Sequence, residues 1–309
     1  MTSDRLPWQL WRPEFSRFAA SFSPIKKLMI PFEKAPRDAV LGRIGQLEVR
    51  LVRTRRELHA AQRLRFVVFY EEKLAQVTTG GMTRFGRDVD DFDAICDHLI
   101  VIDNAAHEPG NGRAKPKPKI VGTYRLLRQD VAMRHGGFYS QSEFDLTDLL
   151  ARHAGKRFLE LGRSCVMREY RTKRTVELLW HGIWSYILRH KIDVMIGCAS
   201  LHGTDIDHLS DQLTLLSRAV RTPDEWQVRA HPHHYVAMDR ATGSFSERQA
   251  LAALPPLIKG YLRLGAYIGD GAVVDHAFGT TDVLVVLPVE NISPRYITHY
   301  GEDAGRYAA

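Results

Sequence analysis

The sequence predicts an α/β protein, built on a mixed, partly parallel sheet with helices on both faces. Short apolar runs that are typical of strands alternate with longer amphipathic segments that are typical of helices. Two of the apolar runs, 98–103 and 119–127, have only a loop rich in Gly, Asn and Pro between them, which indicates an antiparallel hairpin. Because of this hairpin, we do not expect a regular doubly wound parallel sheet.

The N-terminal region differs in composition from the rest of the chain. Aromatic residues such as Trp8 are interleaved with basic ones such as Arg12, and five prolines exclude one long helix. This composition fits an interfacial membrane segment. It fits equally well a flexible extension or an arm that packs on the main domain. We divide the chain into a basic, aromatic extension at 1–46, a main domain at 47–300 and a tail at 301–309.

The first elements of the main domain follow from its periodicity. Residues 47–53 alternate apolar and charged side chains, which predicts a half-buried strand. Apolar residues recur at helical spacing over 55–70, which predicts a helix. After the hairpin, residues 144–153 are expected to form a helical turn that Asp145 or Thr147 caps.

The clearest local unit lies at 157–200, where a strand, a basic turn, an amphipathic helix and a second strand follow one another. Between Val176 and Leu188 the apolar residues follow an i, i+3, i+4, i+7 pattern, so one face of this helix is expected to be buried. Thr172 or Thr175 can cap the start of the helix.

The C-terminal third contains further helices and strands. Residues 208–220 predict a helix, and so do residues 254–264, where two prolines stand in the first turn and are tolerated there. Two strand pieces, 266–269 and 272–275, flank a turn rich in glycine, and 282–287 is an apolar strand that a proline ends.

Charge and cysteine content limit the classes of function. The net charge of +7 and the pI near 9.3 indicate an anionic partner, which is a nucleic acid, an anionic membrane surface or an acidic carrier protein. Three cysteines without a CxxC pair argue against a disulfide framework and a zinc ribbon. Neither a signal peptide nor a transmembrane run is recognisable. We therefore expect a cytoplasmic protein, with peripheral contact to the inner face of the membrane left open.

The strand at 157–166 carries the first indication of chemistry. Glu160 and Arg163 are charged residues in an apolar strand, which is costly unless they are paired or used. The following helix begins behind a basic turn, and a helix N-terminus is a good phosphate site. The residues that we expect to hold a phosphopantetheine arm are Val166, Arg168, Arg171, Lys173 and Arg174. These features predict an acyltransferase with a carboxylate in reach of an amine.

The basic turn also indicates which molecule donates the acyl group. Residues 168–175 contain no glycine, so close approach of the backbone to a diphosphate is not expected. The arm of a carrier protein has one phosphate and no nucleotide, and side chains suffice to hold it. The turn therefore favours acyl carrier protein over coenzyme A, although a merely solvated basic turn is the structural alternative.

Several segments together resemble one known family. They are residues 65–72, 91–99, 121–127, 160–166, 196–200, 254–265 and 281–283. As a set they are similar to the ornithine N-alpha-acyltransferases of bacterial ornithine-lipid synthesis, which are relatives of the acyl-homoserine-lactone synthases within the GNAT fold. The resemblance covers roughly residues 47–300 and implies a GNAT-like N-acyltransferase domain there.

The resemblance implies a particular reaction. A 3-hydroxyacyl group would pass from acyl carrier protein to the alpha-amine of L-ornithine and give lyso-ornithine lipid. The implied partners are the carrier protein as donor and L-ornithine as acceptor. No tightly bound cofactor, no metal and no nucleic acid are expected.

Roles for single residues follow from the matching motifs. Glu160 is the leading general base, because an ammonium group must lose a proton before it attacks a thioester. Arg163 keeps the three-residue spacing from Glu160 that the related synthases show. The resemblance further implies a substrate pocket that contains Arg65, Phe69, Asp93, Asp97 and Arg125. In it the arginines hold a network with Asp93 and Asp97, although these two stand four residues apart and the synthases tend to use three. Asp275 and Asp282, beside the turn Gly269-Asp-Gly271, are candidates to line the amine pocket from the last strands, although turn chemistry alone explains the glycines.

Structural alternatives remain for these residues. Glu160 can instead form an ion pair with Arg163 or another arginine, and the other charged residues can form a surface cluster. Cys165 and Cys198 are weak candidates for a catalytic cysteine that carries the acyl group, because both lie in apolar runs, where a small buried cysteine is the ordinary case. The sequence His231-Pro-His-His234 is a weak metal signature, since no carboxylate or cysteine stands at ligand spacing.

Two other functions stay open. One is a signal synthase of the acyl-homoserine-lactone type, although the block at 254–287 and the length of the chain argue against it. The other is a non-enzymatic basic protein that binds membranes or nucleic acid. No helix-turn-helix, zinc or RNA-binding signature supports nucleic acid as its partner.

Overall fold

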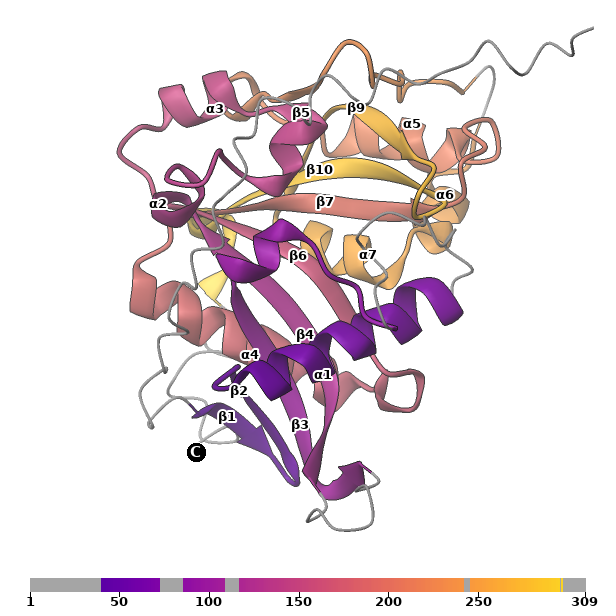
Figure 1. The fold of residues 1–309 in the computed structure, drawn as a ribbon. Coiled ribbons are helices and arrows are strands. Elements are labelled where there is room, and N and C mark those ends of the chain that lie inside the picture. The colour runs from indigo at the N-terminus through magenta and orange to yellow at the C-terminus, as the bar shows by residue number, and fades with distance from the viewer. Residues whose placement is uncertain (1–39, 73–85, 109–116, 242–244, 295, 297–309) are drawn as a thin grey trace, which may run out of the picture. The chain divides into compact units, whose positions relative to one another are not determined.

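The computed structural model describes residues 40–72, 86–108, 117–241, 245–294 and 296. In this part of the chain a ten-stranded sheet has the order β1-β2-β3-β4-β6-β7-β10-β9-β8-β5 (Figure 1). The predicted tail at 301–309 and most of the predicted N-terminal extension lie outside the described residues. No helix of the described residues has the length and hydropathy needed to cross a bilayer.

The first four strands form an antiparallel meander. They are β1 (Val40–Ile44), β2 (Leu47–Leu51), β3 (Asp97–Glu108) and β4 (Lys117–Arg128). The predicted hairpin is confirmed as β3 and β4. The boundary predicted at residue 46 was wrong, because β1 pairs with β2 and so belongs to the main sheet.

The predicted strand–helix–strand unit is confirmed. Strand β6 (Phe158–Val166) leads through a 3-10 turn (Arg168–Tyr170) to helix α4 (Lys173–His190) and then to β7 (Val194–His202), which runs parallel to β6. The Thr172 side chain accepts a hydrogen bond from the backbone N–H of Thr175 and caps the helix as predicted.

The C-terminal strands complete the sheet. Strand β10 (Thr280–Pro288) lies between β7 and β9 (Tyr267–Asp275) and is antiparallel to both. The two strand pieces expected around Gly269 and Gly271 form this single strand β9. The register with β10 shifts near Gly271, whose φ of 88° suits glycine. The short strands β8 (Arg229–Ala230) and β5 (Phe144–Asp145) form the edge.

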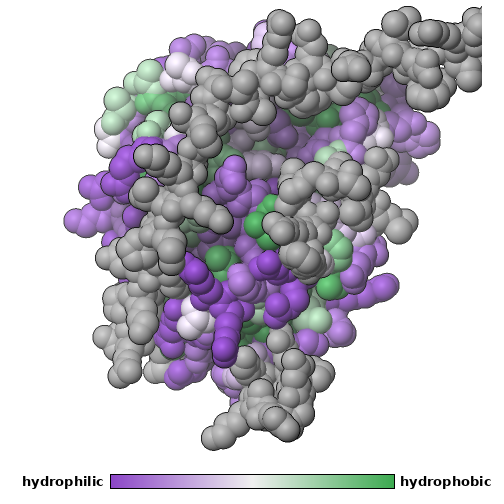
Figure 2. Space-filling view, viewed as in Figure 1, coloured by the Kyte–Doolittle hydropathy of each residue, from purple (hydrophilic) through white to green (hydrophobic). Residues whose placement is uncertain are grey.

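The helices confirm the prediction that both faces of the sheet are covered (Figure 1). Along β4, Val121 packs into the cluster that contains α4, whereas Ile120 packs into the cluster of α1 (Arg55–Phe66). Since neighbouring strand residues point to opposite faces, α1 and α4 lie on opposite sides. Figure 2, viewed from the α1 side, shows mainly hydrophilic side chains over this helix.

The remaining helices are short. They are α2 (Gln129–Ala132), α3 (Thr147–Arg152), α5 (Ser210–Ala219), α6 (Glu247–Ala253) and α7 (Pro256–Arg263). The helices predicted at 144–153, 208–220 and 254–264 are thereby confirmed with shorter bounds. A π-helical turn (Val67–Glu71) continues α1, and 3-10 turns occur at Asp91–Ala94, Tyr139–Ser142, Asp224–Trp226 and Val289–Asn291.

The two parallel strands separate soon after they meet. Strand β6 pairs with β7 only from Phe158 to Glu160, after which β6 continues along β4 and β7 along β10. One extra residue in β6 bulges against β4 between Gly162 and Cys165, and Arg163 there has a φ of 49°. Among the described residues, the separation leaves backbone groups of β6 and β7 without a partner strand on their facing sides.

Gly197 lies at the point of separation, and its replacement by alanine is expected to destabilise the fold. A Cβ there would come within 2.3 Å of the Leu161 carbonyl oxygen, which is backbone and cannot rotate away. Overpacking of this kind costs about 1–3 kcal/mol. Urea unfolding should show the loss for Gly197→Ala and none for Gly155→Ala, because a Cβ at Gly155 meets open space. Equal stability of the two variants would contradict this description of the separation.

Candidate active site

A buried network of arginines and aspartates lies where α1 meets β4 and β6. The arginines come from three different elements, and the aspartates come from the segment that precedes β3. Its members are Arg65, Arg125, Arg163, Asp88, Asp90 and Asp93. Three positive and three negative charges therefore balance inside the protein, which a set of buried ions requires.

Arg65 is the centre of this network and is only 1% exposed. Its two Nη atoms donate to the two carboxylate oxygens of Asp93 at 2.8 Å each, which is a bidentate pair. Its Nε lies 2.7 Å from Asp88 Oδ2, close enough for an ion pair although the two atoms are not aligned as a hydrogen bond. Burial by itself would raise the pKa of Asp93, but the Arg65 guanidinium outweighs it and holds this pKa well below its usual range.

The other two arginines share Asp90. Nη1 of Arg125 lies 2.6 Å from Asp90 Oδ1, and Nη2 of Arg163 lies 3.1 Å from Asp90 Oδ2. Arg163 also reaches Asp88, with Nε 3.3 Å from Oδ2. The network thus ties the bulge of β6 to α1 and β4, and it fixes Arg163 at the place where the strands separate.

Aromatic rings cover the network. The Arg163 guanidinium lies 4.8 Å from the Tyr139 ring centroid and 5.1 Å from that of Phe278. Arg125 lies 5.5 Å from the Tyr139 ring centroid. Phe69, from the π-helical turn, packs edge-on against Phe278 at 6.0 Å between centroids. Phe69 therefore borders the site through Phe278.

Asp97 does not join the network, in contrast to the expectation that it pairs there with Asp93. Its carboxylate accepts a hydrogen bond from the Tyr186 hydroxyl at 2.6 Å and lies 3.8 Å from Arg128. Asp88 and Asp90 take the place that was predicted for it. One signal for Asp90 is present in the sequence: Asp90 and Asp93 form a capping box over the 3-10 turn, a pattern readable from their three-residue spacing.

Glu160 is buried near the network but forms no hydrogen bond or ion pair with an arginine in the described structure. Its Oε2 accepts the backbone N–H of Tyr139 at 2.8 Å. Its Oε1 accepts the backbone N–H and the hydroxyl of Ser140 at 2.8 and 2.6 Å. Burial raises the pKa of Glu160, and these hydrogen bonds only partly oppose the rise. The ion pair considered as the structural alternative is thus replaced by an anchor for the Tyr139–Ser142 turn.

A cluster of three carboxylate side chains lies at the end of the Tyr139–Ser142 turn. Carboxylate oxygens of Glu143, Asp275 and Asp282 lie within 4.8 Å of one another. The Cys198 thiol of β7 donates to Glu143 Oε2 at 3.3 Å. Burial and the neighbouring carboxylates raise the pKa of Glu143 to about 7 and that of Asp282 to about 6. Asp282 was among the predicted site residues, whereas Glu143 was not.

The predicted phosphopantetheine residues lie at and after the end of β6. The Val166 carbonyl accepts a hydrogen bond from Arg171 Nε at 3.0 Å, and Arg171 forms an ion pair with Glu72. Lys173 is 88% exposed and lies 3.6 Å from Glu177, one helical turn further on. The first turn of α4 contains no acidic residue. With Arg168 and Arg174 also exposed, the N-terminus of α4 is a positively charged surface beside the separated strands.

Known proteins identify the family of this chain. A family model described as an acetyltransferase (GNAT) domain matches residues 64–181. An L-ornithine N(alpha)-acyltransferase of Rhizobium meliloti (strain 1021) is 56% identical over 276 residues, which are 89% of this chain and 91% of the relative. The chain belongs to the L-ornithine N(alpha)-acyltransferase family. It is an acyltransferase with the GNAT fold, as the sequence predicted, and the non-enzymatic alternative is excluded.

A second relative agrees with this assignment. The L-ornithine N(alpha)-acyltransferase of Agrobacterium fabrum (strain C58 / ATCC 33970) is 52% identical over 87% of this chain and 90% of its own length. Among solved structures, an N-acyl amino acid synthase from uncultured soil microbes has a TM-score of 0.42 and 13% identity. That alignment covers 79% of this chain and 91% of the synthase.

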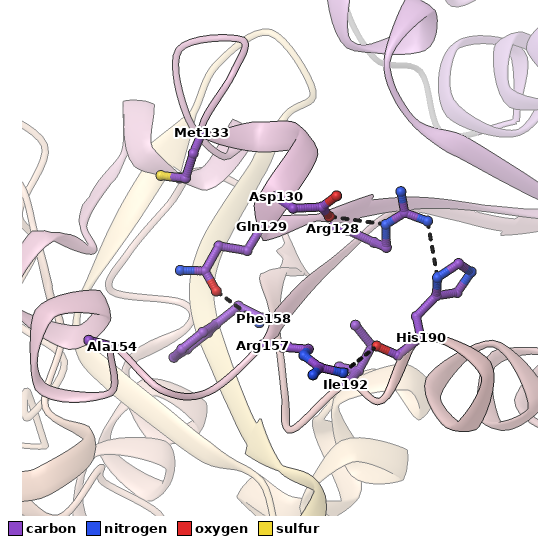
Figure 3. Close-up of a pocket in the computed structure, with 9 residues that line it drawn as sticks. All are labelled: Arg128, Gln129, Asp130, Met133, Ala154, Arg157, Phe158, His190 and Ile192. Carbon is purple, nitrogen blue, oxygen red and sulfur yellow. Dashed lines mark hydrogen bonds and ion pairs between the residues drawn. The ribbon is translucent and has the colours of Figure 1, made fainter.

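The acyltransferase also has a cavity at the opposite end of β6 from the basic turn (Figure 3). The cavity measures about 620 Å³, and its walls come from the end of β4, the start of β6 and the end of α4. Arg128 donates to Asp130 at 3.1 Å and lies 3.1 Å from His190 Nδ1 in its wall (Figure 3). None of the predicted site residues lines it, so this cavity is separate from the candidate active site.

Proposed function

We propose that this acyltransferase moves a 3-hydroxyacyl group from acyl carrier protein to the alpha-amine of L-ornithine and forms lyso-ornithine lipid. We propose L-ornithine as the acceptor because the chain is 56% identical, over 89% of its length, to a protein named L-ornithine N(alpha)-acyltransferase. The donor is inferred from the positively charged surface at the start of α4, which has side-chain cations and no glycine-rich loop.

We propose that the thioester of the acyl donor binds where β6 and β7 separate. Backbone N–H groups that have lost their partner strand can polarise the thioester carbonyl as negative charge develops on it. In this proposal the pantetheine arm runs along the end of β6, and its phosphate meets Arg168, Lys173 or Arg174. The acidic carrier protein would approach the same positively charged surface.

The acceptor amine must lose a proton, and we propose Glu160 for this step. Glu160 lies in the last paired position before the strands separate, and burial raises its pKa toward the range that a general base requires. Arg163 stands three residues further along β6, at the bulge. Arg65, Asp93 and Arg125 would act indirectly, by holding Arg163 and the covering rings in place.

The proposal is tested by thioester release. The protein is incubated with L-ornithine and 3-hydroxyacyl carrier protein, and the free thiol and the N-acyl product are measured. We expect release of one thiol for each N-acylornithine formed, faster than with the coenzyme A thioester of the same acyl group. Nα-acetylornithine is the control acceptor and should not react. Absence of turnover with ornithine at every chain length would overturn the proposal, and faster turnover with coenzyme A would overturn the donor assignment.

The signal synthase alternative is separated by its product. Mass spectrometry of lipid extracts and of culture supernatant from cells that express the chain should detect an N-acylornithine in the lipids. An acyl-homoserine lactone in the supernatant would favour the alternative instead.

A further inference from the structure

The group of Glu143, Asp275 and Asp282 has an unusual charge balance. Each aspartate of the buried network has at least one arginine in ion-pair distance, whereas these three carboxylates have no such partner within the described part of the chain. Their oxygens nevertheless lie within 4.8 Å of one another. Like charges at this distance repel strongly unless a cation lies between them or protons neutralise them.

Asp282 adds an independent observation. It is 8% exposed, and its Oδ1 has no hydrogen-bond partner among the residues that the structure describes, although the Ser200 and Thr280 hydroxyls lie close enough to lower the pKa of this carboxyl group. Asp275 differs, because its Oδ1 accepts the backbone N–H groups of Ala277 and Phe278 in the turn between β9 and β10. A buried acceptor oxygen without a donor is costly and is a feature of ligand sites. One carboxylate oxygen of Asp282 lies within 4.8 Å of those of Glu143 and Asp275, so a donor bound among the three side chains also reaches Asp282.

The position of the group links it to the acyltransferase site. Glu143 directly follows the Tyr139–Ser142 turn that Glu160 anchors. Cys198, which donates to Glu143, lies on β7 two residues after the last pairing with β6. Arg163 influences the pKa of both Glu143 and Asp282. The carboxylates therefore lie on the β7–β10 side of the strand separation.

We infer that Glu143, Asp275 and Asp282 form a seat for the side-chain ammonium group of the acceptor, and that this seat selects a diamino acid. The inference rests on the proposed function and deepens it. An ammonium group offers three N–H donors and one positive charge, which matches three carboxylates that have no cation in ion-pair distance among the described residues. With the side-chain ammonium held there, the amine at the other end of the amino acid is the one left to react.

The seat predicts how acceptor preference changes in variants. Asp282→Asn and Glu143→Gln keep the shape of the side chains and remove a charge. A charge-assisted hydrogen bond contributes about 1.5–3 kcal/mol, or roughly 10- to 150-fold. We expect KM for ornithine to rise by about this factor in each variant. We expect no such change for norvaline, which has the same chain length without the second amine. Asp270→Asn is the matched control, because Asp270 lies on β9 outside the group and pairs with Arg229.

The ratio of kcat/KM for ornithine to that for norvaline is the deciding measurement, with the ornithine-induced rise in melting temperature as a second readout. A ratio that falls about 10-fold or more, with the ligand-induced rise lost and the fold retained, supports the seat. An unchanged ratio overturns it, and so does an equal loss of kcat with both acceptors, which would mark a role in proton transfer. Loss of ornithine turnover in EDTA that a divalent cation restores would also overturn it in favour of a metal. If the unmodified protein does not acylate ornithine at all, it is the proposed function that fails.

Discussion

Replacement of Arg65 by methionine is expected to lower the free energy of unfolding by about 3–5 kcal/mol, because it leaves two buried carboxylates without their main cation. Asp93 would lose both hydrogen bonds of its bidentate pair, and Asp88 would keep the more distant Arg163 as its cation and the Tyr70 hydroxyl as a hydrogen-bond donor. Methionine fills a similar length of the space that the Arg65 side chain occupies, so the loss of stability would come from charge rather than from volume. Urea unfolding followed by circular dichroism measures the effect.

The control is Arg56→Met on the same helix, where the side chain is exposed and a change within about 0.5 kcal/mol is expected. A second variant, Arg65→Met with Asp93→Asn, removes one of the two carboxylate charges that lost their main cation and should recover part of the stability. If Arg65→Met unfolds at the same urea concentration as Arg56→Met, the network does not stabilise the fold in the way described.

The fold followed from periodicity wherever one face of an element is buried. The apolar pattern of α4 and of the β3–β4 hairpin was sufficient, because their burial repeats along the sequence. Strand β1 was not predicted from periodicity. Gly42 interrupts its pattern, and the reason lies far away in the sequence: a Cβ there would collide with His181 of α4 at 2.3 Å. A periodic pattern of residues that are close in the sequence cannot reveal a contact between residues that are far apart in the sequence.

The candidate site was predictable only in part, for a similar reason. Arg65, Arg125 and Asp93 were predicted to share a network and do so. Asp88 and Asp90 were missed, because they lie in an irregular segment whose path no periodicity fixes. Glu143 was missed because its neighbours Asp275 and Asp282 come from strands that lie far along the chain. Regular elements can be derived from sequence, whereas a site assembled from turns depends on how the sheet brings them together.

Glu160→Gln is expected to lower kcat by about 100-fold or more, since a positioned general base contributes roughly 10²–10⁴-fold to a rate. Glutamine keeps one carbonyl acceptor, but its amide group would face a backbone N–H of Tyr139 or Ser140, donor against donor. Loss of an anchoring hydrogen bond costs about 1–3 kcal/mol, so stability should also fall. Turnover of ornithine and urea unfolding must therefore be measured on the same preparation.

Ser140→Ala separates proton transfer from anchoring. This variant removes the 2.6 Å hydrogen bond to Glu160 Oε1 and keeps the carboxylate and both backbone donors. The Ser140 hydroxyl lowers the pKa of Glu160 against the larger effect of burial, so its loss raises that pKa further. If deprotonated Glu160 takes the proton of the amine, the acidic limb of the pH–rate profile moves to higher pH in Ser140→Ala. Full turnover in Glu160→Gln would exclude Glu160 as the base. Equal losses of kcat in both variants, with the profile unmoved, would leave Glu160 with only the anchoring of the Tyr139–Ser142 turn.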